Sequence, residues 1–223
     1  RVQSVAVRLI VEREREIQHF QSSDYYRVTG RFLLPSGVEV DAELNHRFST
    51  KEDTERFLEH CKNAHFIVEN IQTKPYVRVP PPPFTTSTLQ QEAAHKLNFS
   101  VAQTMMVAQR LYESGHITYM RTDSVNLSNL CLATSRDFIA RQLGPDYVKT
   151  RRYKTNLKSA QEAHEAIRPT YIDRTTLEGG SQERRLYEIV WKRTVASQMA
   201  DALLEKMTAT ITVSGSQYQF VAS

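Results

Sequence analysis

Four consecutive prolines, at positions 80–83, constrain the fold of this chain more than any other feature of its sequence. Proline fixes its φ angle and has no amide hydrogen to donate, so neither a helix nor a central strand can continue through the run. Such a segment is typical of a semi-rigid connector between two bodies. The length of 223 residues allows one large domain or two modest ones, and the prolines favour the second arrangement.

The residues before the prolines are predominantly β in character. Alternating apolar and polar side chains on both sides of residues 35–37 predict a hairpin, and Gly215 marks a second turn near the end of the chain. A short helix is expected at residues 51–62, with Ser49 or Thr50 as its N-cap. The predicted strands cover residues 24–34, 38–48, 65–79, 207–213 and 217–222.

Helical periodicity replaces this pattern after the prolines. The predicted helices cover residues 88–97, 101–114, 128–143 and 182–201. Thr85, Ser87 and Thr88 are the residues available to cap the first of them, and Gly115 is expected to end the second in a left-handed conformation. Strands on both sides of these helices predict an α+β multidomain fold, in which a helical domain is inserted into a β-rich domain.

A separate helical pattern occupies residues 1–20. Val2, Val5, Leu9 and Ile10 recur at helical spacing, which predicts a packed apolar face. The chain therefore begins within a helix and stops within a strand-like run, and it carries no signal peptide. We expect it to be a piece of a longer protein.

The composition is that of an ordinary globular protein, with 40% hydrophobic and 24% charged residues and no apolar run long enough to span a membrane. A net charge of +4 is weak evidence for nucleic acid by itself. From Lys149 to Lys158, however, five basic residues occur without an acid between them. This run could be either a solvated loop or a segment that contacts phosphates. Cys61 and Cys131 follow no metal or redox spacing and are expected to be reduced and buried.

The segment from Gly115 to Ser124 carries the residues best suited to chemistry. A short extended run is expected there, and side chains at alternating positions of such a run share one face. Tyr119, Arg121 and Asp123 would then lie side by side as a nucleophile, a fixed cation and a carboxylate. A phenolic oxygen can attack a phosphodiester, and a guanidinium group can stabilise the charge that develops on the phosphate oxygens.

The same residues have structural interpretations. Tyr119 could be a core tyrosine, Arg121 could form a surface ion pair with Asp123, and Asp123 could cap the following turn or orient a neighbour. His164 could be a packing residue, since neither a second histidine nor a cysteine pair completes a metal motif. Three glutamates alternate within residues 12–16, but positions i and i+2 of a helix point apart. No metal site is expected in this chain.

Five segments of the chain resemble the type IA DNA topoisomerases and occur in the order of that family. They are residues 1–6 (Arg-Val-Gln-Ser-Val-Ala), 84–91 (Phe-Thr-Thr-Ser-Thr-Leu-Gln-Gln), 104–113 (Thr-Met-Met-Val-Ala-Gln-Arg-Leu-Tyr-Glu), 115–124 (Gly-His-Ile-Thr-Tyr-Met-Arg-Thr-Asp-Ser) and 159–169 (Ser-Ala-Gln-Glu-Ala-His-Glu-Ala-Ile-Arg-Pro). Because they extend over most of the chain, the resemblance is specific. The strand-rich parts are less distinctive.

The resemblance implies roles for individual residues. Tyr119 would be the catalytic nucleophile, and Arg121 would contact the scissile phosphate. His164 would hydrogen-bond the phosphate near the tyrosine, and Arg168 would be either a phosphate-contacting or a structural partner. The residues expected to bind DNA are His164, Arg168, Asp123, Arg1 and Gln3.

The resemblance also implies a domain arrangement. Residues 21–83 and 204–223 would form a β-rich arch, and residues 84–203 would form the helical domain that holds the tyrosine. Residues 1–20 would be the end of a helix associated with the DNA gate of the parent enzyme.

An enzyme of this family is an isomerase that cuts one DNA strand, holds the 5′-phosphate on its tyrosine, passes another strand and reseals the break. The resemblance therefore implies relaxation of negative supercoils without ATP. The expected partners are single-stranded and negatively supercoiled DNA, and the expected state is a monomer in the cytoplasm, associated with the nucleoid. The family binds Mg²⁺ through an Asp-x-Asp-x-Glu site in another domain, which has no match here. This chain alone is expected to be inactive.

Two other kinds of function stay open on the sequence. The chain could be a non-catalytic module for single-stranded nucleic acid, in which Tyr119 stacks on bases, or a structural or protein-interaction domain without a role in DNA chemistry. A tyrosine recombinase is disfavoured, because its His-x-x-Arg set does not match the spacing of His164 and Arg168.

Overall fold

The computed structural model describes residues 2–153 and 164–223. The chain forms two compact units, which we call the β unit (residues 1–75 and 205–223) and the helical unit (residues 76–204). The prolines at 80–83 belong to neither a helix nor a strand. The α+β class expected from the sequence is confirmed.

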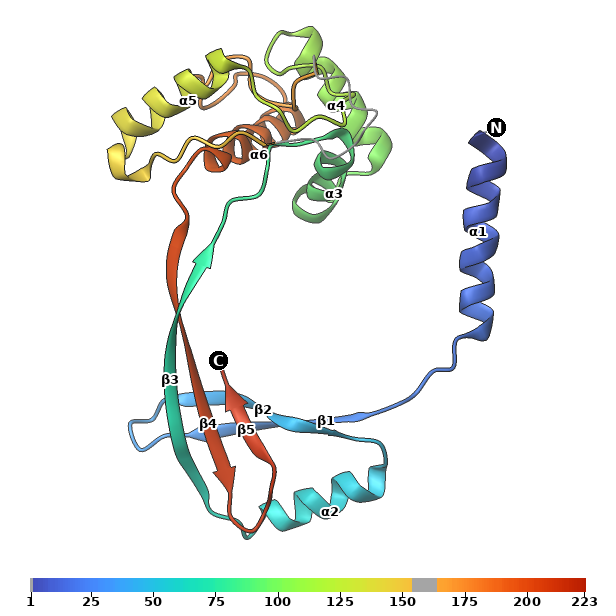
Figure 1. Cartoon of the computed structure of the whole chain (residues 1–223), viewed down its shortest axis with the longest axis vertical. Helices are drawn as coiled ribbons and strands as arrows, with labels where there is room; N and C mark the ends of the chain where they lie inside the picture. The colour runs from blue at the N-terminus through green and yellow to red at the C-terminus, as the bar shows by residue number, and fades with distance from the viewer. Residues whose placement is uncertain (1, 154–163) are drawn as a thin grey trace. The chain divides into compact units, whose positions relative to one another are not determined.

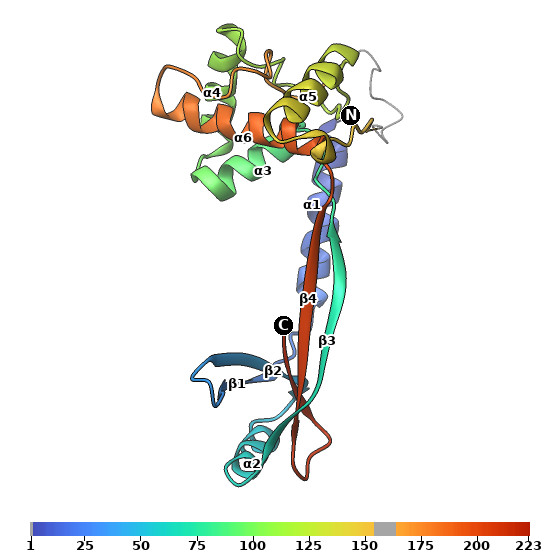
Figure 2. The ribbon, with the colours of Figure 1, turned by 90° about the vertical axis from the view of Figure 1, so that its left-hand side faces the viewer.

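One antiparallel five-stranded sheet, in the order β1-β2-β5-β4-β3, dominates the β unit (Figure 1). Its strands are β1 (Tyr26–Leu33), β2 (Glu39–Phe48), β3 (Phe66–Arg78), β4 (Ala202–Val213) and β5 (Gln219–Ala222). The long strands β3 and β4 lie beside one another in both ribbon views (Figure 2). Pro75 occurs within β3, which is an edge strand, where a missing amide donor is tolerated.

Helix α2 (Lys51–Cys61) covers part of this sheet. Its N-cap is Thr50, whose hydroxyl accepts a hydrogen bond from the Asp53 amide at 3.2 Å, as one of the two sequence-based alternatives predicted. Phe57 from the helix packs with Leu44 and Phe220 from the sheet in a small buried core. The helix is thus held by both a cap and a buried aromatic ring.

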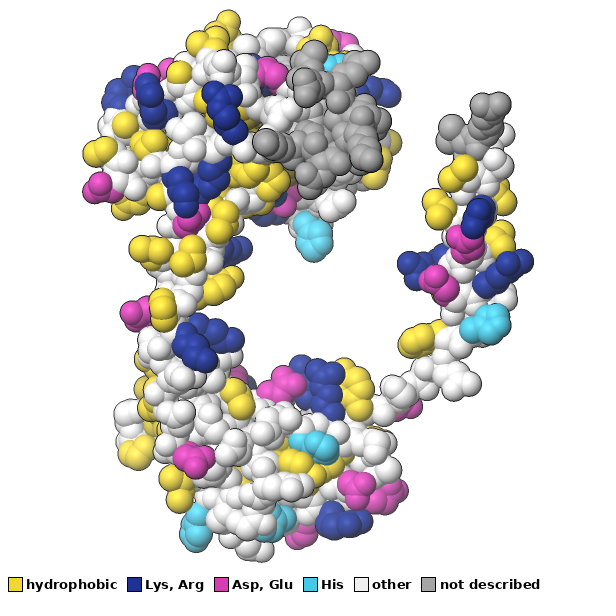
Figure 3. Space-filling model, viewed as in Figure 1, with side chains coloured by type: hydrophobic (Ala, Val, Ile, Leu, Met, Phe, Trp, Pro, Cys, Tyr) yellow, Lys and Arg dark blue, Asp and Glu magenta, His cyan; other side chains and the backbone are white. Residues whose placement is uncertain are grey.

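Helix α1 (Val2–His19) differs from its prediction in one respect. The helix is present, but Val5, Leu9 and Ile10 are 59%, 62% and 68% exposed, so the expectation of a packed apolar face is wrong for this chain. Figure 3 shows hydrophobic side chains on the surface of this helix. A helix buries such a stripe only when another element lies against it. No described element covers these three side chains.

The helical unit contains helices α3 (Thr86–Leu97), α4 (Val101–Glu113), α5 (Asn129–Gln142) and α6 (Ser181–Ser197), with the short 3₁₀ helix η1 (Pro145–Tyr147). Thr85 caps α3 in a capping box: its hydroxyl accepts from the Thr88 amide, and the Thr88 hydroxyl accepts from the Thr85 amide. Gly115 follows α4 with a φ angle of 71°, as predicted.

The boundary between α6 and β4 is the largest error of the predicted elements. The helix was expected to reach residue 201 and the strand to begin at 207, whereas α6 ends at Ser197 and β4 begins at Ala202. The sequence Ala-Leu-Leu-Glu-Lys at 202–206 favours a helix by local propensity. Pairing of β4 with β3 overrides that preference.

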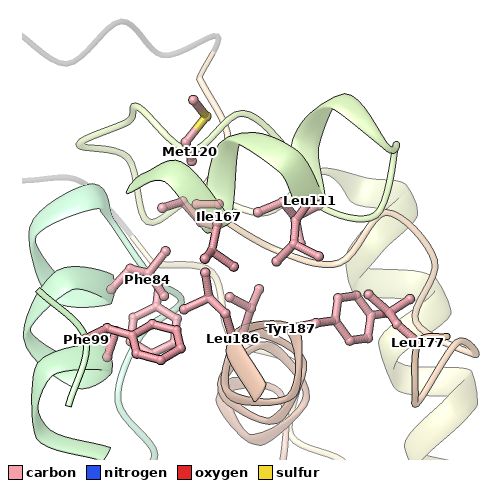
Figure 4. Close-up of a cluster of buried hydrophobic side chains, with 14 residues drawn as sticks. Phe84, Phe99, Leu111, Met120, Ile167, Leu177, Leu186 and Tyr187 are labelled. Carbon is pink, nitrogen blue, oxygen red and sulfur yellow. The ribbon is translucent and has the colours of Figure 1, made fainter. Parts of the chain in front are cut away.

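The core of the helical unit joins the helices to two loop segments (Figure 4). Leu111 from α4 and Leu186 from α6 pack with Met120 and Ile167, and all four side chains are at most 1% exposed. Tyr187 is also buried, and burial raises the pKa of its hydroxyl to about 12. Met120 and Ile167 come from the two loops that carry the candidate site residues.

Candidate active site

Three segments that are distant in sequence meet in the helical unit. Phe84 pairs with Ile167 through an antiparallel bridge, and Ile117 pairs with Pro169 in the same way. The Thr118 amide also donates to the Arg168 carbonyl at 2.9 Å. The segment that follows His164 is therefore joined on one side to the start of α3 and on the other side to the tyrosine segment.

Thr86 fastens the tyrosine segment to α3. Its hydroxyl donates to the Met120 carbonyl at 2.8 Å and accepts from the Thr122 amide at 2.9 Å, and its own amide donates to the Thr122 carbonyl at 2.9 Å. The backbone is therefore held immediately before and after Arg121. The sequence suggested only capping by the neighbours of Thr86, because a hydrogen bond between residues 86 and 122 leaves no periodic signal.

The tyrosine segment is irregular rather than a regular extended run. Only Ile117 forms a bridge, and a bend follows at Met120. From Tyr119 onward the side chains nevertheless alternate in burial: Tyr119 is 49% exposed, whereas Met120 is 1% exposed. Arg121 and Asp123 are exposed as well. The three side chains that were predicted to share one face of an extended run are thus all exposed, and buried neighbours rather than a regular strand hold their backbone.

Tyr119 lies in a depression of about 430 Å³. Its ring packs edge-on against Tyr112, with 5.2 Å between ring centroids and an interplanar angle of 64°. The depression is lined by Tyr112, Thr118, Tyr119, Arg121, Thr122, His164 and Glu165. Tyr119 is therefore not a core tyrosine, and the structure places it with Arg121 and His164.

Arg121 makes no hydrogen bond or ion pair with any residue that the structure describes, so the surface ion pair with Asp123 is not formed. Its side chain and that of His164 also line a second depression, of about 610 Å³. Asp123 lies on this side, together with the hydroxyl groups of Thr85 and Ser87. Arg121 and His164 thus border both depressions.

Asp123 does not have the capping role considered for it. Helix α5 is capped by Ser128, whose hydroxyl accepts from the Cys131 amide. Within residues 2–153 and 164–223, the Asp123 carboxylate has no hydrogen-bond partner, so it does not orient Arg121 or His164 through a direct contact.

Arg168 occupies a different environment from Arg121. Its side chain is only 13% exposed, and its guanidinium donates to Glu165 Oε2 at 2.6 Å and to the Pro169 carbonyl at 3.0 Å. Glu165 Oε1 in turn accepts from the Ser128 amide at 2.6 Å. Burial raises the pKa of Glu165, but the hydrogen bonds from Ser128 and Arg168 outweigh it, so the pKa is lowered overall. This geometry fits the structural alternative for Arg168.

The basic run after η1 is partly neutralised. Lys149 Nζ lies 2.5 Å from Asp201 Oδ2, and Arg151 forms an ion pair with the other oxygen of the same carboxylate. The hydrogen bond from Lys149 and that from Arg151 lower the pKa of Asp201. Lys154 and Lys158 lie outside the described residues. Lys149 and Arg151 therefore bind the end of α6 to its neighbouring loop, whereas Arg152 is exposed and donates to the Asn129 side-chain oxygen at 2.8 Å.

The remaining predicted residues fall elsewhere. Arg1 lies outside the described residues, and Gln3 is exposed on α1 in the β unit. Cys131 is buried as expected, whereas Cys61 is only half-buried, and burial raises the pKa of both thiols. In the described ranges, no three His, Cys, Asp or Glu side chains come together to hold a metal ion, and no helix is both long and apolar enough to cross a membrane.

A half-exposed tyrosine lies beside an arginine that has no ion pair within the described ranges, and such a pair offers a nucleophile and a cation that could act on a phosphodiester. The class of protein follows from a family model described as DNA topoisomerase, which matches residues 1–223. The chain belongs to this DNA topoisomerase family.

Individual relatives agree with this assignment. DNA topoisomerase 1 of Zymomonas mobilis is 45% identical over 95% of this chain and 18% of its own length, and that of Rickettsia bellii is 42% identical over 98% of this chain and 30% of its own length. The structure of full-length topoisomerase I from Thermotoga maritima has a TM-score of 0.75 and 34% identity, and it is matched over 99% of this chain and 37% of that chain. The resemblance to bacterial topoisomerase I is confirmed, and the chain spans less than a third of the two sequence relatives.

Proposed function

We propose that this chain supplies the strand-cleaving tyrosine of a type IA DNA topoisomerase. The observation that carries the proposal is the position of Tyr119 in one depression with Arg121 and His164, where the guanidinium has no partner among the described residues. Membership of the DNA topoisomerase family supports DNA as the substrate.

In the proposed reaction, the Tyr119 oxygen attacks a phosphorus atom of one DNA strand. The phenolic proton leaves, the bond from phosphorus to the 3′-oxygen breaks, and that oxygen departs as a hydroxyl group. The 5′-phosphate stays on the tyrosine as an ester. Arg121 stabilises the charge on the phosphate oxygens, and His164 hydrogen-bonds the same phosphate. The reverse attack by the 3′-hydroxyl reseals the strand without ATP, because the ester conserves the bond.

The domain roles belong to the same proposal. Residues 21–83 and 204–223 form the β-rich arch, residues 84–203 form the active-site domain inserted into it, and residues 1–20 belong to the DNA gate. The parent enzyme would relax negatively supercoiled DNA as a monomer in the bacterial cytoplasm. The proposal places Mg²⁺ in other parts of the parent enzyme, and no three His, Cys, Asp or Glu side chains of the described residues come together. We expect the 223-residue chain alone to lack relaxation activity.

The test uses a protein that joins residues 1–223 to the remaining segments of its relatives, incubated with single-stranded DNA labelled at its 3′-end. The labelled fragment carries the 5′-phosphate, so wild type should give a denaturant-resistant adduct. Tyr119→Phe should give none. Tyr171→Phe, which removes the hydroxyl of another exposed tyrosine in the same unit, should behave as wild type. An adduct with Tyr119→Phe, or none with wild type, would contradict the proposal.

The contribution of Arg121 is tested in the same assay. Arg121→Ala should lower the rate of cleavage by about 100-fold to 1000-fold, the loss that follows removal of one transition-state donor. Arg121→Lys keeps the charge without the planar fork and should recover only part of the rate. An unchanged rate in Arg121→Ala would exclude a role for this guanidinium in the reaction.

A further inference from the structure

A third depression lies in the β unit, far along the sequence from Tyr119. It has a volume of about 580 Å³ and is formed by the end of β2, one side of α2 and the turn between β4 and β5. We call it the α2 groove. Gly215 in the turn has a φ angle of 74°, and a Cβ atom there would lie 3.2 Å from the His60 ring. Glycine thus allows the turn to approach α2 closely.

The side chains of the α2 groove are mostly basic. Arg47, Arg56, His46 and His60 line it, against one acid, Asp53. The guanidinium of Arg47 lies 4.5 Å from the centroid of the Tyr25 ring, and it has no ion pair among the residues described.

A depression on the same sheet provides an internal contrast. It is lined by Arg27 and Arg31 and has a volume of about 530 Å³. There, Arg31 Nε lies 2.9 Å from Asp41, and Arg27 lies 3.6 Å from Glu43. Both arginines therefore have carboxylate partners, whereas in the α2 groove Arg56 shares Asp53 with the Thr50 hydroxyl and Arg47 has none.

The α2 groove also contains a stacked ring pair. His46 lies parallel to Tyr218, with 4.4 Å between ring centroids and an interplanar angle of 15°. Phe48 and Phe57 contact Tyr218 edge-on from the core, so the ring pair has a fixed orientation. Flat rings beside arginines form the usual platform for single-stranded nucleic acid, in which bases stack and phosphates are neutralised.

We infer that the α2 groove is a second binding site for single-stranded DNA, separate from the tyrosine site. Arg47 and Arg56 contact successive phosphates, and the His46–Tyr218 ring pair contacts a base. The identity of the ligand as DNA rests on the proposed function, whereas the groove itself rests only on the geometry of the β unit. The site would hold a stretch of strand without cutting it.

The experiment measures the affinity of the 223-residue chain for a fluorescent oligothymidylate by anisotropy at several salt concentrations. Arg47→Ala with Arg56→Ala should weaken binding by about 10-fold and lower the slope of log K against log salt by about 1.4, as expected for two lost phosphate contacts. Arg27→Ala with Arg31→Ala removes the same charge from the neutralised depression. This control should change affinity less than about 2-fold and leave the slope unchanged.

Further arms separate the sources of affinity. An abasic strand of equal charge should bind about 10-fold more weakly than the thymidylate, because it cannot stack. Equal losses of affinity in the two double variants would contradict the proposed DNA site in the α2 groove. Equal affinity for the thymidylate and the abasic strand would contradict the proposed contact of the ring pair with a base. Far-UV circular dichroism checks that both variants fold. Binding needs no strand cleavage, whereas the proposed function is tested by adduct formation, so the failure of one proposal is distinguishable from the failure of the other.

Discussion

The two compact units bury their apolar side chains to different extents. In the helical unit, Leu111, Ile167 and Leu186 are at most 1% exposed. In the β unit, Leu33 and Met207 are 72% and 61% exposed and line an apolar depression of about 1060 Å³, and α1 leaves its apolar stripe uncovered. Because Met120, which adjoins Tyr119, is part of the closed core, the position of the candidate nucleophile is set by packing within one unit. The β unit instead presents accessible surface.

The largest effect expected from this difference is the loss of stability when a side chain of the closed core is truncated. Leu186→Ala should lower the free energy of unfolding by about 3 kcal/mol, because it leaves a cavity in a fully buried cluster. Leu33→Ala should change it by less than about 0.5 kcal/mol. Urea denaturation checks both by circular dichroism, and the fluorescence of Trp191, the single tryptophan, reports on the helical unit. Similar losses in the two variants would remove the distinction between the units.

Local chemistry made much of this architecture predictable. The prolines at 80–83, the hairpin turn and the glycine after α4 act through backbone geometry that any environment preserves. Thr50 and Thr85 were among the proposed caps for the same reason. The tyrosine and arginine of the site were found because alternation and a family motif coincide at Tyr119 and Arg121.

The contacts that hold the site were not predictable in this way. The hydrogen bonds of Thr86 to residues 120 and 122 and the bridge from Ile117 to Pro169 join positions whose proximity depends on the whole core. Arg168 was assigned to DNA from its motif, although Glu165, three positions earlier, was available as an internal partner. The start of β4 was missed because pairing, rather than local preference, decides it.

The second prediction concerns the ion pair beneath the site. Glu165→Gln should lower the free energy of unfolding by about 2 kcal/mol, since it leaves the buried Arg168 guanidinium without its charged partner. The loss should disappear at low pH. The pKa of Glu165 is lower in the folded chain than its ordinary value of 4.5, so its contribution is present above that value and is lost as the pH falls through the folded value.

Denaturation of both proteins between pH 3 and pH 7 measures this dependence, and the two curves should converge toward the acid end. Glu113→Gln is the matched control, because Glu113 is an exposed glutamate whose side chain accepts a hydrogen bond from Gln109 within α4. Glu113→Gln should leave the free energy of unfolding almost unchanged at every pH. If the difference in free energy of unfolding between wild type and Glu165→Gln stayed constant with pH, the charge of residue 165 would not contribute to stability.

The third prediction tests whether the helical unit positions Arg121. Thr86→Val should lower stability by about 1.5 kcal/mol and reduce cleavage by the joined protein, because the backbone on both sides of Arg121 loses its hydrogen bonds to the hydroxyl. Thr86→Ser restores the hydroxyl and should restore cleavage. Thr134→Val removes a comparable hydroxyl bond to a carbonyl within α5 and should leave cleavage unchanged. Equal cleavage by Thr86→Val and wild type would restrict Thr86 to a role in folding.

The smallest effect separates local capping from packing. Thr50→Ala removes the N-cap of α2 in the β unit, and Thr85→Ala removes that of α3 in the helical unit. Each should cost about 1 kcal/mol, because a cap satisfies only the amides at the end of its own helix. Thermal unfolding should show midpoints about 2–4 °C below wild type in both cases, and serine at either position should recover most of the loss. Matched costs would assign the contrast between the units to burial alone. A much larger cost for Thr85→Ala would mean that the α3 cap also supports the tyrosine segment through Thr86.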